Sequence, residues 1–332
     1  MMRVAISGFG RIGRCLVWAI HERGLEEEIQ VVAINDLVEP RVLAHLLRHD
    51  TTHGHFRTPV SLDGDRLTVG NQEIVCLSQK DPSSLPWGDL GVDLVLECTG
   101  KMKKRELLGQ HLEAGAPRVL VAYPVPDADR TVVYGINHDQ LQPSDRVVSN
   151  ASCTTNCLAP LAKVLNDSFG IVRGQMTTIH AYTNDQNLID KAHNDLYRAR
   201  AAASNLIPTR TGAADAVGLV LPELAGKLDG MAVRVPTINV SMVDLHALLK
   251  EEVSVDAINA AMKRASEGEL KGVLGYTDEP LVSVDFNHSS FSAIHDASQT
   301  RSLGNQVKVL AWYDNEWGFT NRMLDVAWVM GA

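Results

Sequence analysis

The glycine-rich run Gly8-Phe9-Gly10-Arg11-Ile12-Gly13 constrains the fold of this chain more than any other segment. The apolar run Val4 to Ile6 precedes it and a helical pattern follows, which predicts a strand, a tight turn and a helix. Asp36 ends the next apolar run, IQVVAIND. A G-x-G-x-x-G turn in this context, with an acidic residue after the following strand, is typical of dinucleotide-binding domains.

The glycines have separate roles in such a turn. Gly8 makes the tight turn, Gly10 lets the main chain approach a pyrophosphate, and Gly13 lets the helix pack on the strand. The start of the helix attracts phosphate through its N–H groups and partial positive charge. Arg11 and Ile12 lie between these glycines and are assigned to the same cofactor site. The alternative, a turn that binds nothing, is disfavoured by this context.

Asp36 indicates which dinucleotide is bound. A carboxylate at this position accepts hydrogen bonds from the adenosine ribose hydroxyls and repels a 2′-phosphate. The predicted cofactor is therefore NAD rather than NADP.

Length and composition favour a soluble, two-domain protein. The chain has 332 residues, against roughly 100–200 residues per domain. Apolar residues make up 45% and charged residues 21%, without an apolar run long enough for a transmembrane helix or an apolar secretory signal at the N-terminus. We expect a cytoplasmic protein. The net charge of −9 argues against nucleic-acid binding as the main role.

The arrangement of apolar runs differs between the two halves of the chain. Up to about residue 150, short runs alternate with helical patterns, which predicts βαβ units and a parallel sheet. Beyond about residue 170 the runs are longer and partly alternating, which predicts a mixed or antiparallel sheet. These later runs are GQMTTIHAYT, MAVRVPTINVSMVDLHALL, PLVSVDF and QVKVLAWYD, with helices expected near 155–166, 213–221 and 255–266.

The predicted fold class is α/β, with an N-terminal Rossmann NAD-binding domain and an α+β catalytic domain. The final segment, WGFTNRMLDVAWVM, has helical spacing and is expected to pack on the first domain. We therefore predict an NAD-binding domain from 1–151 and 317–332, and a catalytic domain from 152–316.

The stretch SNASCTTNCLAP carries Cys153 and Cys157. No second ligand pair lies nearby, so a zinc site is disfavoured and no metal site is predicted. A disulfide is also disfavoured, because side chains four residues apart on a helix point in nearly parallel directions. The remaining interpretation is that one of the two cysteines is a nucleophile.

Cys153 is the better candidate for that nucleophile. It would lie in the first turn of a helix, where the dipole and N–H groups lower a thiol pKa and stabilise an oxyanion. Cys157 would lie one turn deeper and be shielded. His180 is the candidate base, because it ends the strand-like run QMTTIH just before a polar loop.

Five motifs together resemble the phosphorylating glyceraldehyde-3-phosphate dehydrogenase family, and the resemblance covers essentially the whole chain. A sister branch, erythrose-4-phosphate dehydrogenase, shares most of them. The resemblance implies a two-domain subunit that binds NAD and assembles as a homotetramer. The motifs are GFGRIGR, SNASCTTNCLAP, IHAYTNDQ, GMAVRVPT and WYDNEWGFTNRMLD.

The resemblance also implies a mechanism. Cys153 would attack the aldehyde to form a thiohemiacetal, and His180 would favour the thiolate by ion pairing and take the hemiacetal proton as hydride leaves. Inorganic phosphate would then attack the resulting thioester and release an acyl phosphate. Asn315 matches the residue that fixes the nicotinamide carboxamide, and Thr99 and Gly100 are placed at the cofactor site.

Two anion sites follow from the resemblance, one for the substrate phosphate and one for the attacking phosphate. Hydroxyls and guanidinium groups suit both, because they are strong, directional donors to phosphate oxygens. The first site comprises Thr183, Arg198 and Arg234, and the second Ser152, Thr154, Thr211 and Gly212. Arg234 lies in an otherwise apolar strand, where a charge needs a partner.

Framework phrases such as LPWGDLGVDLVLECTG, TVVYGIN and VSVDFNH are similar to the erythrose-4-phosphate branch. The stretches HAYTNDQ and PTRTGAA, however, keep Thr183, Thr211 and Gly212. These positions touch the chemistry, so the favoured reaction is conversion of D-glyceraldehyde 3-phosphate to 1,3-bisphosphoglycerate, with erythrose 4-phosphate oxidation as the alternative.

The chain departs from the family pattern at two places. It has AYPVP, Ala122 to Pro126, where a small-residue stretch like SAPS is usual near the nicotinamide half of the cofactor. It also has Lys191-Ala192 where NAD-preferring members carry Leu-Pro. A lysine near the adenosine ribose would attract a 2′-phosphate against the repulsion of Asp36, so we predict NAD with some NADP use.

Two further classes of function are less favoured. A nucleotide-binding redox sensor would use an accessible Cys153, but it would not need the residues of both anion sites. A non-phosphorylating, NADP-linked aldehyde dehydrogenase would have a different domain plan and a glutamate–cysteine arrangement that this sequence lacks.

Overall fold

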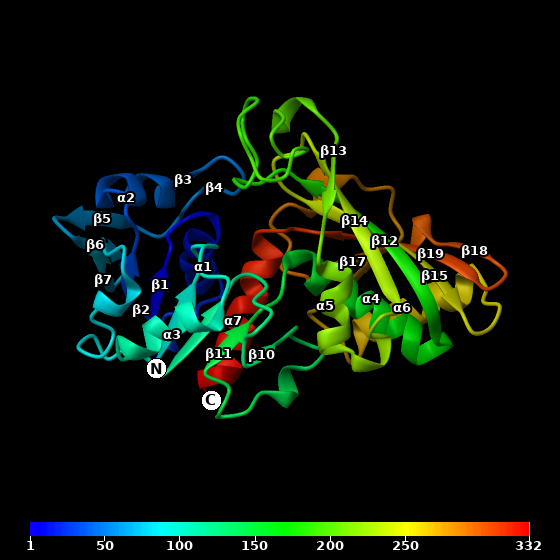
Figure 1. The fold of residues 1–332 in the computed structure, drawn as a ribbon, viewed down its shortest axis with the longest axis horizontal. Coiled ribbons are helices and arrows are strands. Elements are labelled where there is room, and N and C mark those ends of the chain that lie inside the picture. Colours follow the sequence, from blue (N-terminus) through cyan, green and yellow to red (C-terminus); the bar gives the residue numbers. More distant parts are fainter. Residues whose placement is uncertain (332) are drawn as a thin grey trace. The chain divides into compact units, whose positions relative to one another are not determined.

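The computed structural model describes residues 1–331, which form two compact units (Figure 1). The first unit contains Met1–Val132, His138–Ala151 and the chain from Thr320 onward. The second contains Val133–Asn137 and Ser152–Phe319. Within residues 1–331, no helix is both long and apolar enough to cross a bilayer.

The first unit is built on a sheet with the strand order β10-β11-β9-β8-β1-β2-β7-β6-β5. Strands β10 to β7 in this order are all parallel. Most of them read as continuous buried runs, as expected for strands covered on both faces. The strands are β1 (Met2–Ser7), β2 (Ile29–Asn35), β5 (Val60–Asp63), β6 (Arg66–Val69), β7 (Gln72–Leu77), β8 (Leu94–Glu97), β9 (Arg118–Val121), β10 (Arg130–Thr131) and β11 (Val147–Ser149).

One edge of this sheet is antiparallel, in addition to the parallel strands that the sequence predicted. Strand β6 pairs antiparallel with both β5 and β7 through two-residue loops. Gly64 and Gly70 occupy these loops with φ of 58° and 56°. Tight hairpin turns require this left-handed conformation, and glycine adopts it without a steric penalty.

The helices of the first unit are α1 (Arg11–Glu22), α2 (Pro40–Arg48), α3 (Arg105–Glu113) and the part of α7 (Trp317–Gly331) that begins at Thr320. A short hairpin, β3 (His49–Asp50) with β4 (Gly54–His55), follows α2. The C-terminal helix is anchored to the unit by an ion pair, because Arg23 Nη2 donates to Asp325 Oδ1 at 2.7 Å.

The second unit contains a mixed sheet, which confirms the predicted α/β class with a mixed second sheet. The strand order is β13-β14-β12-β15-β19-β17-β16, and β18 also pairs with β19. Strand β12 is parallel to β14 and antiparallel to β15. The strands are β12 (Ile171–Ala181), β13 (Ile207–Arg210), β14 (Leu228–Val235), β15 (Ser241–Leu249), β16 (Leu274–Thr277), β17 (Ala293–Asp296), β18 (Arg301–Leu303) and β19 (Gln306–Tyr313).

Three α-helices pack against this second sheet (Figure 1). They are α4 (Cys153–Phe169), α5 (Ala213–Val220) and α6 (Val255–Glu267), in agreement with the three helices expected from the sequence. Helix α4 contacts β12, β15, β17 and β19, so the cysteine-bearing helix lies across the centre of the sheet.

The segment PLVSVDF was predicted to be a strand, and this prediction is wrong. Residues Ser283–Phe286 form a short 3₁₀ helix. The side chain of Asp285 accepts a hydrogen bond from the Val282 N–H at 2.8 Å. Such local side-chain bonds compete with strand pairing, and the valines Val282 and Val284 remain exposed rather than covering a core.

Candidate active site

Cys153 is the first residue of helix α4. Ser152 caps this helix, because its Oγ accepts a hydrogen bond from the Thr155 N–H at 3.0 Å. Ala151, just before the cap, has a φ of 56°, which is uncommon for a residue with a side chain. The local chain therefore places the Cys153 thiol at the N–H-rich start of a helix, as its hydroxyl-rich sequence predicted.

The structure brings Cys153 and His180 together. His180 is buried near the end of β12, and its Nε2 lies 3.5 Å from the Cys153 Sγ. Cys157, one turn further along α4, is fully buried. Only Cys153 therefore combines partial exposure with a neighbouring imidazole on this helix.

Strand register places Arg234 beside His180. The parallel pairing of β12 with β14 sets these two residues opposite each other. Arg234 Nη1 lies 2.7 Å from His180 Nδ1 and donates to the Ala181 carbonyl at 3.0 Å. That carbonyl also lies 2.6 Å from His180 Nδ1.

These contacts offer His180 two neutral tautomers. With the proton on Nδ1, the ring donates to the Ala181 carbonyl and Nε2 can accept the proton of the Cys153 thiol. With the proton on Nε2, Nδ1 accepts from Arg234 and the ring can donate to a thiolate. The geometry therefore allows His180 to act as a base, which becomes an imidazolium when Nε2 takes the proton, or as a neutral hydrogen-bond donor to a thiolate.

Burial shifts the pKa values of Cys153 and His180 in the directions that disfavour a thiolate–imidazolium ion pair. Burial lowers the pKa of His180 to about 3, and the positive charge of Arg234 adds to this effect. Burial raises the pKa of the Cys153 thiol, although Arg234 and the donors of Thr154 and the helix start act in the opposite direction. The expected net lowering of the Cys153 pKa is therefore wrong for the ligand-free protein, because burial outweighs the helix donors.

Arg198 belongs to the same electrostatic neighbourhood. Its positive charge contributes to lowering the pKa values of both His180 and Arg234. Its Nε donates to Thr209 Oγ1 at 3.0 Å, and its guanidinium forms an ion pair with Asp185. Burial and the nearby Arg198 both lower the pKa of Arg234, which indicates a place where an anion would be stabilised.

Thr183 follows β12 and is partly buried, with its N–H 3.4 Å from Gln186 Oε1. In Arg234, the Nε atom is buried and has no hydrogen-bond partner among residues 1–331. A buried donor of this kind is costly unless a partner is supplied. This favours an anion near Arg234.

The starts of helices α4 and α5 lie together. Thr155 Oγ1 donates to the Ala213 carbonyl at 3.5 Å. Gly212 is the N-cap of α5, and Thr211 Oγ1 accepts from the Ala213 N–H at 3.2 Å. Two helix N-termini in one place, beside the Ser152 cap, form a suitable environment for a second anion.

Thr154 points its side chain into the protein. Its hydroxyl lies 2.8 Å from the Tyr313 hydroxyl, which lies 2.9 Å from the Thr178 hydroxyl. A contact of Thr154 with phosphate would therefore use its main-chain N–H. Sequence reasoning missed Tyr313, although a tyrosine in the apolar run QVKVLAWYD signals a buried hydroxyl that needs partners.

The glycine turn fits a dinucleotide. Gly8 has a φ of 89°, and a Cβ added there would lie 2.7 Å from the Thr99 nitrogen. A Cβ on Gly13 would lie 2.3 Å from the Gly8 carbonyl oxygen, so α1 can approach β1 only with glycine at this position. At Gly10, an added Cβ meets nothing within 4 Å. The open space at Gly10 is where the main chain can meet a pyrophosphate.

Asp36 lies at the carboxyl end of β2, next to the glycine turn. Its Oδ2 accepts from the Phe9 N–H at 2.8 Å and its Oδ1 from the Val38 N–H at 3.1 Å. Arg11 forms an ion pair with Asp50, and Ile12 lies beside it in the first turn of α1. For these two residues, the groups suited to phosphate are main-chain N–H groups at the helix start.

The remaining cofactor candidates occupy strand ends. Thr99 and Gly100 follow β8, and Gly100 has a φ of 71°. In the second unit, Asn315 follows β19 and its Oδ1 accepts a hydrogen bond from Ser241 Oγ at 2.7 Å. This bond orients the Asn315 side chain.

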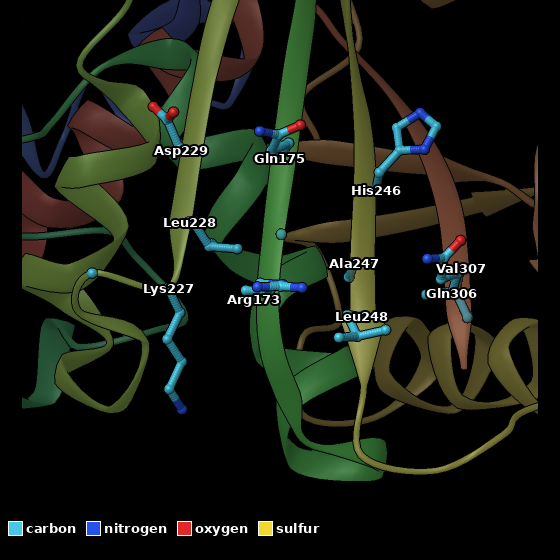
Figure 2. Close-up of a pocket in the computed structure, with 12 residues that line it drawn as sticks. Arg173, Gln175, Lys227, Leu228, Asp229, His246, Ala247, Leu248, Gln306 and Val307 are labelled. Carbon is cyan, nitrogen blue, oxygen red and sulfur yellow. The ribbon is translucent and has the colours of Figure 1, made fainter.

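A groove of about 590 Å³ lies elsewhere, on the second sheet (Figure 2). Its lining includes Arg173, Gln175, Lys227, Asp229, His246 and Gln306. It is centred on the end of β12 remote from His180, and none of its lining residues belongs to the sites described above. The groove is therefore not the site of the cysteine chemistry.

Comparison with known proteins agrees with this geometry. Residues 2–105 match the family described as "Glyceraldehyde 3-phosphate dehydrogenase, NAD binding domain", and residues 152–315 match its C-terminal domain. The first match confirms the predicted NAD cofactor.

The similarity to individual proteins extends over the full chain. A glyceraldehyde-3-phosphate dehydrogenase of Pseudomonas aeruginosa is 56% identical over 331 residues, which cover 100% of this chain and 98% of that protein. The enzyme of the same name from Geobacillus stearothermophilus is 54% identical over 98% of this chain and 97% of its own length. This chain therefore belongs to the glyceraldehyde-3-phosphate dehydrogenase family.

Proposed function

We propose that this protein catalyses the NAD-dependent oxidative phosphorylation of D-glyceraldehyde 3-phosphate to 1,3-bisphosphoglycerate. The observation that carries the proposal is the Cys153 thiol at the start of α4, 3.5 Å from His180 Nε2. Arg234 contacts His180, and the charge of Arg198 reaches both residues. A nucleophile, a base and paired cations are what a phosphorylated aldehyde requires.

In the first half of the reaction, Cys153 Sγ adds to the aldehyde carbon. His180 Nε2 takes the thiol proton, and the N–H groups at the start of α4 stabilise the oxygen that becomes negative. The protonated His180 returns this proton to that oxygen, which gives the thiohemiacetal. His180 then removes the hydroxyl proton as the carbon loses its hydride. NAD, bound in the N-terminal domain, supplies the hydride acceptor, and the product on Cys153 is a thioester.

In the second half, inorganic phosphate attacks the thioester carbon. A new carbon–oxygen bond forms, the carbon–sulfur bond breaks, and Cys153 leaves as a thiolate. The starts of α4 and α5, with Ser152, the Thr154 N–H, Thr211 and Gly212, would bind this phosphate. The phosphate of the substrate would be bound by Thr183, Arg198 and Arg234. This phosphate would compete with Asp185 for the Arg198 guanidinium.

We also propose that the protein is a cytoplasmic homotetramer. Alternation along β12, β14 and β15 places three apolar side chains on the same face of the second sheet as the groove: half-buried Ile179 and Met242, and exposed Met231. They support this face as a contact between copies of the chain. A second copy would cover these apolar side chains. A cytoplasmic location suits a reaction that depends on a reduced thiol.

The test is NADH formation with glyceraldehyde 3-phosphate or erythrose 4-phosphate, each with and without inorganic phosphate. We expect fast, phosphate-dependent turnover on the triose and loss of turnover in Cys153→Ala. Cys157→Ala, on the same helix, is the matched control and should retain turnover. Faster, phosphate-independent turnover on the tetrose would instead assign the protein to erythrose 4-phosphate oxidation, and full activity of Cys153→Ala would refute the covalent mechanism.

A further inference from the structure

A buried polar cluster lies behind the predicted cofactor loop of the first unit. Glu97, at the end of β8, is fully buried. Its Oε1 accepts hydrogen bonds from the Thr99 N–H at 2.7 Å and from the Thr99 hydroxyl. Its Oε2 lies 3.2 Å from His111 Nε2. A carboxylate in this position holds the turn that leads to Gly100.

The protonation of this cluster follows from its hydrogen bonds. Trp87 Nε1, which can only donate, lies 3.0 Å from His111 Nδ1. Nδ1 therefore accepts, and His111 carries its proton on Nε2 and donates it to Glu97. These donors outweigh the cost of burial and lower the pKa of Glu97, so it is an ionised acceptor.

Tyr123 completes the cluster from a second loop. It lies in the stretch Ala122 to Pro126, the departure from the usual small-residue sequence. Its hydroxyl accepts from the Met102 N–H at 3.2 Å, and it can donate to Glu97 Oε1 at 3.2 Å or to the Met102 carbonyl at 3.3 Å. Glu97 therefore holds the Thr99 end of the segment from Thr99 to Met102, and the Tyr123 phenol holds its Met102 end and contacts Glu97.

The other end of this connection is also fixed. Ser149 Oγ donates to the Tyr123 carbonyl at 2.9 Å, so the tyrosine main chain is tied to the end of β11. A side chain as short as that of alanine or serine at this position could not span to Glu97 and Met102. The tyrosine thus adds a specific constraint on the loop after β8.

We propose that Tyr123 is a positioning residue for the cofactor, which acts by holding Thr99 to Met102 in the conformation that binds NAD. The inference rests on the proposed function, because it assigns Thr99 and Gly100 to the NAD site. Without the hydroxyl, the Met102 N–H and Glu97 each lose a partner, and NAD binding must then order a looser loop. Tyr123 thereby sets the affinity for NAD and leaves the chemistry at Cys153 unchanged.

The test is Tyr123→Phe, with Trp87→Phe as the matched control. Trp87→Phe removes the hydrogen bond to His111 from the same cluster, whereas Tyr123→Phe removes the contacts of the hydroxyl with Glu97 and Met102. We expect Tyr123→Phe to raise the Kd for NADH and the KM for NAD about tenfold, the loss of one hydrogen bond to a charged group. Its kcat and its KM for the aldehyde should not change, and Trp87→Phe should lower Tm without this shift.

An unchanged Kd in Tyr123→Phe, or an equal rise in Trp87→Phe, would overturn the inference. If Tyr123→Phe does not fold, the test is hydrogen exchange of the peptide 98–104 in the wild-type protein. Protection of these amides before NAD is added supports a loop that is already ordered. Fast exchange before NAD is added refutes the inference. Wild-type protein that neither binds NADH nor oxidises an aldehyde would refute the proposed function itself, which is a separate result.

Discussion

At the scale of single residues, Arg234 has the largest influence on the reactive pair. It contacts His180, and its charge is the largest influence that lowers the pKa of Cys153 against the effect of burial. The same charge lowers the pKa of His180. Burial and the charge of Arg234 together keep His180 neutral in the physiological pH range, while the same charge favours a thiolate at Cys153.

Replacing Arg234 by glutamine should raise the pKa of Cys153 further. The expected result is slower alkylation of the thiol by iodoacetamide near neutral pH, about tenfold for each unit of pKa. The measurement is the rate of alkylation as a function of pH, with Arg173→Gln, on the exposed and remote end of β12, as the control. A midpoint that stays in place or falls in Arg234→Gln would contradict this account.

At the scale of elements, the turn between β1 and α1 separates the requirements of folding from those of cofactor binding. Gly13 is needed for the close approach of helix to strand, whereas the position of Gly10 has space for a side chain. The two glycines belong to one motif but serve different purposes.

We expect Gly10→Ala to keep the Tm of the wild-type protein and to weaken NAD binding at least tenfold, because a methyl group would occupy the space of the pyrophosphate. Gly13→Ala should lower Tm by several degrees, because its Cβ would clash with the Gly8 carbonyl. Thermal unfolding and NADH titration of both variants test this pair of outcomes. Equal NAD affinity in Gly10→Ala and the wild type would show that the cofactor does not approach this turn.

The helices and strands also show which elements local sequence patterns can predict. Helices α4, α5 and α6 and the glycine turn follow from local periodicity and turn chemistry, and they were predicted correctly. The strand expected at PLVSVDF was wrong, because Asp285 bonds locally to the Val282 N–H. Alternation alone could not reveal that competing bond.

At the scale of the whole molecule, two buried histidines make stability depend on pH. Burial lowers the pKa of His295 to about 4 and that of His180 to about 3. Both values lie below the pKa of about 6.5 in the unfolded chain. Below pH 6.5 the unfolded chain therefore binds protons that the folded protein excludes, and stability is lost as the pH falls toward 4.

The contribution of His295 can be isolated with His295→Gln. The free energy of unfolding of the wild-type protein should fall between pH 7 and pH 5, and about 2 kcal/mol of that fall should disappear in the variant. Urea unfolding at the two pH values measures it, with the exposed His45→Gln as the control. An identical pH dependence in His295→Gln and the wild type would mean that folding does not lower the pKa of His295.

The sequence by itself determined the features that depend on neighbouring residues. These include the glycine turn with Asp36, the capped start of α4 at Ser152 and the placement of Cys153 in its first turn. Turn conformation, capping and helical periodicity are properties of a few consecutive residues, so they are readable without the fold.

Only the tertiary structure decided which distant residues meet and how deeply they are buried. The pairing of β12 with β14 sets Arg234 beside His180, and the neighbouring strands β8 and β9 bring Tyr123 to Glu97. Burial reversed the expected pKa shift of Cys153. Strand register and desolvation depend on segments far apart in the chain, and local sequence patterns carry no information about either.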